Sequence, residues 1–199
     1  MVEIIQAIYY LFALITAFFI VKAFRKGTQT GKKMGTALMM NFLMILTYSL
    51  NLQSDHQVVK SFGCSMMLIF TDLLLFFYYD YVLCFIDWQN RVPKWIKFVF
   101  AAYIFMDAVF MLMIPFTEIA VSFSHCPFGD GYLLTYVPQI PFHVHTVADV
   151  IMILTTMALL LMKCGEVPKV FFKALLRSHR SNAPYDRDQF YLFGGIYSD

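Results

Sequence analysis

The sequence predicts an all-α, polytopic bundle of about five transmembrane helices with its N-terminus outside. Hydrophobic residues make up 60% of the chain and charged residues only 14%, whereas a soluble globular domain has roughly 25% charged residues. The apolar residues gather in five runs, each near the length of about 20 residues that crosses a bilayer. Backbone groups in lipid need partners within their own segment, so these runs are expected to be helices.

The expected spans are residues 4–23, 35–52, 62–86, 95–116 and 142–162. The first is no signal peptide, because Glu3 is the only early charge and the positive residues follow the run. Between the fourth and fifth spans, residues 117–141 are rich in proline and glycine, which favours turns rather than another helix.

Basic residues occupy alternate connections between the spans, and this alternation predicts the orientation. They follow the first, third and fifth spans: Lys22, Arg25, Lys26, Lys32 and Lys33; Arg91, Lys94 and Lys97; and Lys163, Lys169, Lys173, Arg177 and Arg180. The other two connections are poor in lysine and arginine. Because basic loops stay in the cytoplasm, the N-terminus is expected outside.

Four aspartates lie inside the expected spans, where an ionisable side chain is a functional hypothesis by default. At a helical rise of about 1.5 Å per residue, Asp72 and Asp107 lie on the order of 14 Å below the outer surface and Asp149 on the order of 10 Å. Three carboxyls from three helices should therefore share one layer, whereas Asp80 lies nearer the cytoplasm. His145 precedes Asp149 by four residues, so the two share a helix face and can pair.

No lysine or arginine reaches this layer, so its carboxyls must be protonated, hydrogen-bonded, paired with His145 or holding a cation. Two interpretations stay open. The groups join the helices through interhelical hydrogen bonds, or they line a pocket for a small polar ligand, a proton or a cation. The candidate sensing residues are Asp72, Asp107, His145 and Asp149.

No catalytic residue, metal site or cofactor is expected from the motifs. Histidines 143 and 145 point their rings apart on a helix, and the sequence identifies no third ligand. The four cysteines show no CxxC spacing, and a disulfide between Cys64 and Cys126, both expected on the outer side, is left open. Nucleophile and phosphate-binding motifs are absent from the sequence, so the chain is not expected to be an enzyme.

Three stretches carry a resemblance to a known family. They are Leu-Thr-Tyr-Ser-Leu-Asn-Leu-Gln-Ser at 46–54, a polar helix end; Ile-Phe-Thr-Asp-Leu-Leu-Leu at 69–75; and the proline-containing segment 163–173, which includes Val-Pro-Lys-Val-Phe-Phe-Lys. Over about residues 1–175 the chain resembles the N-terminal seven-helix sensor region of bacterial histidine kinases and diguanylate cyclases, most closely the form that precedes a GGDEF output domain.

The resemblance implies an outside N-terminus, seven helices and a cytoplasmic output domain after the seventh. The sequence departs from this pattern after Lys173, where polar residues 177–189 stand in place of a sixth helix, and it contains no Gly-Gly-Asp-Glu-Phe signature and no kinase His box. We therefore expect a sensor-like domain over residues 1–175. Residues 176–199 are expected to be a polar cytoplasmic tail, or the start of a sixth helix, in a truncated chain.

The leading functional hypothesis is a sensory module of the bacterial cytoplasmic membrane that regulates a diguanylate cyclase or histidine kinase domain absent from this sequence. The alternative is a small transporter or channel component that couples protons or cations through the intramembrane carboxylates. The expected partners are the lipid bilayer and an unidentified small ligand or cation, and a homodimer is left open. A net charge of +2 is too small to suggest a nucleic acid partner.

Overall fold

The computed structural model describes residues 2–53, 56–117, 119–128 and 131–180. The elements in chain order are α1 (Val2–Arg25), α2 (Gln29–Gln53), α3 (Gln57–Phe85), α4 (Lys94–Leu112), α5 (Ile114–Thr117), β1 (Val121–Phe128), β2 (Gly131–Pro138) and α6 (Ile140–Arg180). The chain divides into two compact units, Met1–Thr156 and Met157–Asp199. The helical bundle and every contact described below belong to the first unit.

Within the described residues, four helices are long and apolar enough to cross a membrane. They are Ile4–Arg25, Gln57–Phe85, Lys94–Thr117 and Ile140–Cys164. These segments match the first, third, fourth and fifth predicted spans, and their outer faces carry many exposed leucine, isoleucine and phenylalanine side chains. The predicted fold class, a polytopic bundle of transmembrane α-helices, is therefore confirmed, and the chain is a multi-pass membrane protein.

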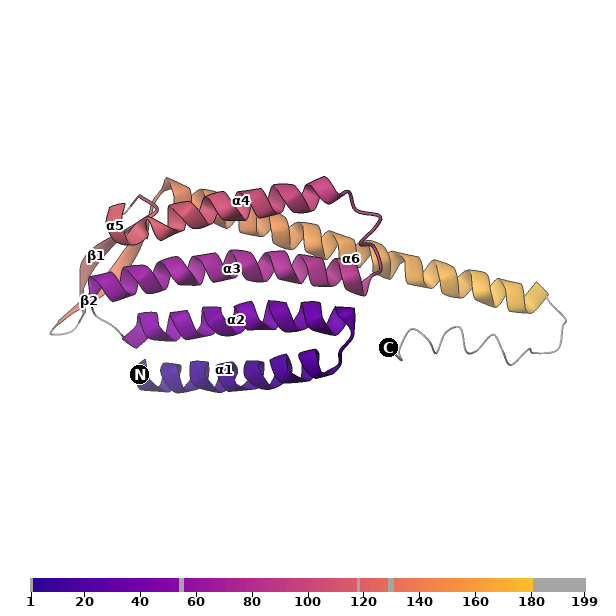
Figure 1. Ribbon diagram of the computed structural model, residues 1–199, viewed down its shortest axis with the longest axis horizontal. Helices are drawn as coiled ribbons and strands as arrows, with labels where there is room; N and C mark the ends of the chain where they lie inside the picture. The colour runs from indigo at the N-terminus through magenta and orange to yellow at the C-terminus, as the bar shows by residue number, and fades with distance from the viewer. Residues whose placement is uncertain (1, 54–55, 118, 129–130, 181–199) are drawn as a thin grey trace. The chain divides into compact units, whose positions relative to one another are not determined.

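The helix α2 holds the second predicted span and is more polar than the other four long helices. It packs along α1 on one side and α3 on the other (Figure 1). Its contact with α1 is close: a Cβ atom added at Gly31 would lie 2.7 Å from the carbonyl oxygen of Ala23, and one at Gly35 would lie 2.9 Å from the ring of Phe24. Because α2 lies between two spans of similar length, we expect it to cross the membrane with them.

Two residues with a left-handed backbone conformation lie in the connections at one end of the bundle. Gly27 follows α1 with φ of 72°, a conformation that glycine adopts without strain, and Asp87 follows α3 with φ of 57°. The α1–α2 and α3–α4 connections lie at this same end (Figure 1). Both are the basic connections of the sequence, so they share one side of the bundle. That this side is cytoplasmic stays a prediction.

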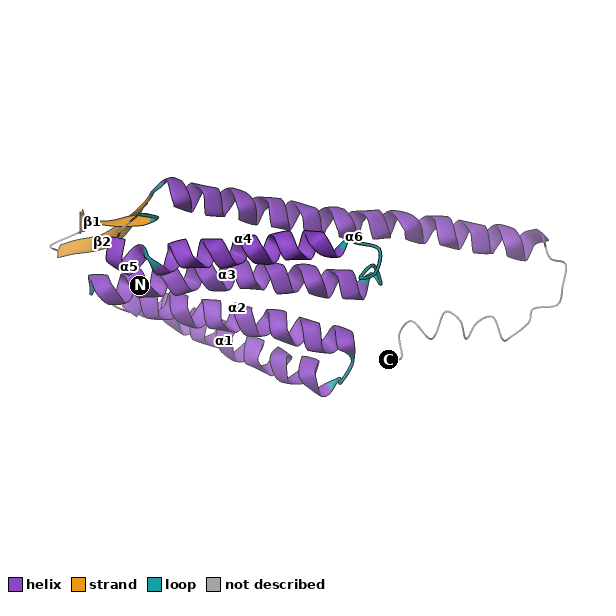
Figure 2. Cartoon of the chain, turned by 45° about the horizontal axis from the view of Figure 1, so that its top comes forward, coloured by secondary structure: helices purple, strands orange, loops and turns teal. Residues whose placement is uncertain are grey.

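A β-hairpin occupies most of the segment between α5 and α6, as the orange strands in Figure 2 show. The strands β1 and β2 are antiparallel, with Val121 opposite Pro138 and Phe128 opposite Gly131. The sequence predicts only turns here, and that expectation missed the strands because proline and glycine hide their alternation. A signal was present, since Gly-Asp between two short apolar runs is typical of a two-residue hairpin connection.

The last helix is longer than predicted. The sequence places the end of the fifth span near residue 162, and the family resemblance implies a proline-containing loop at 163–173. In the structure, α6 is helical from Ile140 to Arg180. Proline lacks a backbone N–H group and weakens a helix interior, yet α6 continues through Pro168. The residues beyond it, Lys-Ala-Leu-Leu-Arg at 173–177, are strong helix formers. The predicted tail is thus helical over 176–180, and residues 181–199 lie outside the described residues.

A buried apolar cluster closes the hairpin end of the bundle. Its members are Cys64, Leu68, Met111, Ile114, Ala120 and Val121, with Phe142 of α6 packed against them. These residues come from α3, α4, α5 and β1, so the base of the hairpin is held against the helix ends. Close backbone packing joins α1 to α2, α2 to α3 and α3 to α4, whereas α6 meets α3 and α4 through side chains next to this cluster.

Candidate functional site

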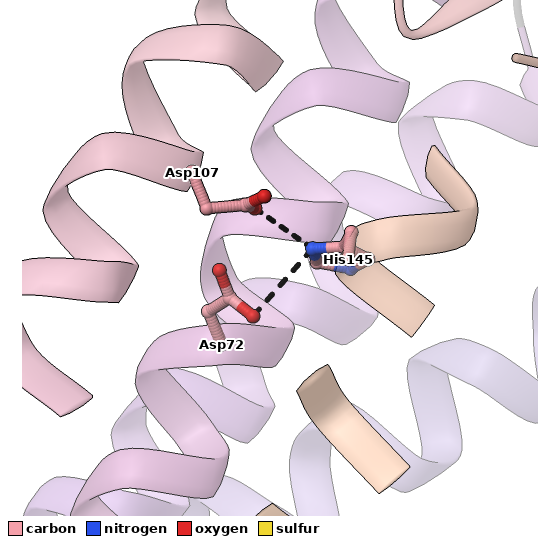
Figure 3. A group of neighbouring side chains, drawn as sticks. All are labelled: Asp72, Asp107 and His145. Carbon is pink, nitrogen blue, oxygen red and sulfur yellow. Dashed lines mark hydrogen bonds and ion pairs between the residues drawn. The ribbon is translucent and has the colours of Figure 1, made fainter. Parts of the chain in front are cut away.

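Three side chains from three helices meet inside the bundle: Asp72 of α3, Asp107 of α4 and His145 of α6 (Figure 3). The Nδ1 atom of His145 lies 2.8 Å from Oδ2 of Asp107, a hydrogen bond, and 3.6 Å from Oδ1 of Asp72. All three residues are buried, with exposed fractions of 0% for Asp72, 6% for Asp107 and 2% for His145. One imidazole nitrogen therefore faces two carboxyls that arrive from different helices.

Two further polar side chains adjoin this group. The second ring nitrogen of His145, Nε2, lies 3.4 Å from Oδ2 of Asp149, one turn further along α6. Tyr103 lies one turn before Asp107 on α4, and its buried hydroxyl interacts electrostatically with all three carboxyls. We call Asp72, Asp107, His145 and Asp149 the acid–histidine cluster, and both nitrogens of its only ring are directed at carboxyls.

The apolar cluster covers the acid–histidine cluster on the hairpin side. Leu68, Met111 and Phe142 lie three or four residues, about one helical turn, from Asp72, Asp107 and His145 respectively. Each helix thus presents a large apolar side chain about one turn from its ionisable one. Asp72 and Asp107 are buried beside these apolar side chains, and contacts between polar groups are stronger in such surroundings than in water.

The charge of the acid–histidine cluster is not balanced by lysine or arginine. Among the described residues, its ion-pair contacts all run through His145. Both carboxylate oxygens of Asp72 are buried without a hydrogen-bond partner in this part of the chain. Burying a carboxylate without a hydrogen-bond partner costs free energy. Binding of a proton, a cation or a polar ligand at Asp72 would remove this cost.

The predicted convergence of acids from separate helices is present in the structure, and so is the pairing of His145 with Asp149. His143 is exposed, as expected if the two rings point apart. Cys64 is buried and forms no disulfide with another described cysteine, and the side chain of Cys126 lies outside the described residues. Sequence reasoning missed Tyr103, although its position one turn from Asp107 was a usable signal.

Asp80 belongs to a separate charged group at the other end of α3. Its carboxylate accepts hydrogen bonds from the Lys33 ammonium of α2, at 2.7 Å, and from the Lys97 ammonium of α4. These side chains are between a fifth and a third exposed. The sequence places Asp80 nearer the cytoplasm but does not predict either partner, because both lysines lie in other helices.

Replacing Asp80 with asparagine should destabilise the bundle by about 1–3 kcal/mol, between the values for exposed and buried ion pairs. The change leaves the two lysines facing each other without a counter-charge. Thermal unfolding of the purified protein in lipid nanodiscs measures the effect. Asp87→Asn, the same chemical change at an exposed left-handed position, should alter the free energy of unfolding by less than about 0.5 kcal/mol. Equal effects of the two variants would contradict the ion-pair assignment.

Comparison of the chain with protein-family models, with curated protein sequences and with solved structures finds no match. The resemblance to the seven-helix sensor region therefore stays a prediction that rests on the three sequence stretches alone. What the structure defines is a class, a multi-pass helical membrane protein with an acid–histidine cluster in its interior.

Proposed function

We propose that this chain is a sensory module of the bacterial cytoplasmic membrane that regulates a cytoplasmic output domain. The observation that carries the proposal is the convergence of α3, α4 and α6 on the buried acid–histidine cluster. The resemblance supplies the output, a diguanylate cyclase or a histidine kinase domain. In this proposal the chain itself catalyses no reaction.

The cluster is suited to sensing because it determines how three helices are held together. A ligand or cation that enters among Asp72, Asp107 and His145 replaces their mutual contacts with contacts to itself. Such a ligand shifts the conformation only by its differential affinity for the two states. Each of the three helices contributes at least one ionisable group to the site. Because polar interactions are strong in a desolvated site, these groups can supply the difference in ligand affinity between the two states.

The helix α6 connects the cluster to the place where an output domain would follow. It carries His145 and Asp149 near its start, and the same helix includes the basic residues up to Arg180. A change in the packing of α6 at the cluster therefore acts on a helix that also contains the cytoplasmic segment. Typical coupling free energies of 1–3 kcal/mol change an output by about 5–150-fold.

A fusion of the whole chain to a diguanylate cyclase domain after Asp199 tests the proposal. We expect Asp107→Asn and His145→Gln to change the rate of cyclic di-GMP synthesis in isolated membranes by at least about fivefold. His143→Gln, the matched change at the exposed histidine of the same helix, should leave the rate within about twofold, because a coupling below about 0.4 kcal/mol changes an equilibrium by no more than that. Equal rates in all four proteins, at equal membrane insertion, would contradict a sensory role.

The alternative is a transporter or channel component, and one observation favours it. Two buried carboxyls and a third that is partly buried, without a lysine or arginine partner in the described bundle, are what a path for protons or cations would need. Proteoliposomes distinguish the two functions. Cation or proton flux that depends on the protein and is lost in Asp107→Asn would favour transport, and ligand binding without flux would favour sensing.

A further inference from the structure

The acid–histidine cluster holds a set of groups that could bind a metal ion. One carboxylate oxygen of Asp72, one of Asp107 and the Nδ1 atom of His145 all lie within 4.8 Å of one another. Imidazole nitrogen and carboxylate oxygen are ordinary ligands of divalent transition metals. The sequence names the three residues as candidates but does not show that their side chains meet, because they lie 35 and 38 positions apart on three helices.

Asp72 gives an independent reason to place a ligand here. It is fully buried, its side chain points at His145 in Figure 3, and neither of its carboxylate oxygens has a hydrogen-bond partner among the described residues. A carboxylate left in this state costs free energy. A cation bound between Asp72 and Asp107 would supply the partner that Asp72 lacks.

The distances suit a metal that is bound by all three groups. Metal bonds to nitrogen and oxygen of about 2.0–2.1 Å place tetrahedral ligand atoms about 3.4 Å apart. The His145 nitrogen lies 2.8 Å from the Asp107 oxygen and 3.6 Å from the Asp72 oxygen. Shifts of less than 1 Å in side-chain position would therefore open the set around a metal, with a fourth position left for water or another ligand.

Charge balance points to a divalent ion. A doubly charged cation balances the carboxylates of Asp72 and Asp107, so that Asp149, which faces the other nitrogen of His145, carries the only remaining negative charge of the cluster. A monovalent cation would leave the pair of acids with a net negative charge. Binding displaces the proton that Nδ1 of His145 shares with Asp107, and this proton leaves to solvent.

Asp149 fits the role of a residue that supports a metal ligand. Metal-binding histidines usually donate their second ring N–H group to a carboxylate, which fixes the orientation of the ring. The Nε2 atom of His145 faces Oδ2 of Asp149 at 3.4 Å, while Nδ1 faces the other two acids. The side chains thus already have the arrangement of such a site, in which a carboxylate (Asp149) contacts one nitrogen of a histidine (His145) and the other nitrogen faces the metal position.

We infer that Asp72, Asp107 and His145 bind one divalent transition-metal ion, of the class of Zn²⁺, Mn²⁺, Fe²⁺ or Co²⁺, with Asp149 orienting His145. A histidine ligand disfavours Mg²⁺ and Ca²⁺, which prefer sets made of oxygen alone, and the absence of a thiolate from this set disfavours Cu⁺. This inference rests on the proposed function in one respect: it names a divalent transition metal as the class of ligand that the sensory module would detect.

Titration of the purified full-length chain with Co²⁺ after chelator treatment tests the inference. In lipid nanodiscs we expect one Co²⁺ per chain with a visible absorption spectrum, and Zn²⁺ should displace it. Asp149→Asn should weaken binding by about 10–100-fold, the usual effect of removing such a supporting carboxylate. Asp72→Asn and His145→Gln, which remove ligands, should weaken it at least as much.

Two variants outside the set provide controls. His143→Gln and Asp80→Asn should bind Co²⁺ as the wild type does, because neither residue contacts the set. The inference is overturned if the wild-type chain shows no saturable Co²⁺ spectrum up to about 1 mM, a Kd that corresponds to only about 4 kcal/mol of binding free energy. It is also overturned if His143→Gln abolishes the spectrum as His145→Gln does.

The metal site and the sensory role can fail separately. Co²⁺ binding that depends on His145, together with unchanged cyclic di-GMP synthesis in the fusion protein, would keep the metal site and remove the sensory proposal. Variant-dependent synthesis in a protein that binds no Co²⁺ or Zn²⁺ would do the reverse.

Discussion

Replacing His145 with alanine should lower the free energy of unfolding by about 3–5 kcal/mol, the usual cost of removing one partner from a buried ion pair. His145 lies within ion-pair distance of three carboxyls and is 2% exposed. Without the ring, Asp72, Asp107 and Asp149 face one another with no basic group between them. Thermal or denaturant unfolding in nanodiscs, with a chelator present to exclude metal, measures the loss.

His143→Ala is the matched control for this variant. His143 lies two residues away on the same helix and is exposed, so its removal should change the free energy of unfolding by less than about 0.5 kcal/mol. Losses of equal size in the two variants would mean that His145 has no special partners. The account of the cluster would then be wrong.

Replacing the whole cluster with apolar residues should have the opposite effect on stability. In the variant Asp72→Val, Asp107→Val, His145→Leu and Asp149→Val, no charge is left without a partner. Apolar replacements of buried ion pairs of similar volume are often neutral or stabilising by about 1–4 kcal/mol. We expect this variant to unfold at or above the temperature of the wild type, and its cyclic di-GMP synthesis in the fusion protein to stop responding to added Zn²⁺.

This variant separates the two interpretations of the buried acids. If they only joined the helices through hydrogen bonds, the apolar variant would keep the wild-type output while its stability changed. A stable variant that has lost its response indicates that the acids are retained for function rather than for folding. Circular dichroism and size-exclusion chromatography check that the variant is folded.

The membrane-spanning helices could be predicted from the sequence, because a lipid environment leaves few alternatives for an apolar segment. Long apolar runs have only one way to satisfy their backbone groups in a bilayer, so four spans were identified within a few residues of their observed ends. The hairpin between α5 and α6 was missed because it lies outside the apolar runs, where proline and glycine are ambiguous. The continuation of α6 past Pro168 was missed because proline weakens a helix without always ending it.

The depth of the candidate site in the membrane could be predicted from the sequence, but the contacts between its side chains could not. The positions of Asp72, Asp107 and Asp149 along their helices place them in one layer, and the four-residue spacing gives the pairing of His145 with Asp149. The rotation of each helix about its own axis decides whether these side chains face one another, and it depends on packing between helices. For the same reason neither lysine partner of Asp80 could be predicted from the sequence.

A double-mutant cycle between Asp107 and His145 tests the central claim most directly, namely that side chains from separate helices meet in a buried cluster. The free energies of unfolding of Asp107→Asn, His145→Ala and the double variant give the coupling energy of the pair. Two groups joined by a hydrogen bond of 2.8 Å should couple by about 1–3 kcal/mol, whereas Asp107 and His143 should be additive within about 0.5 kcal/mol. Additive effects for Asp107 and His145 would contradict the claim.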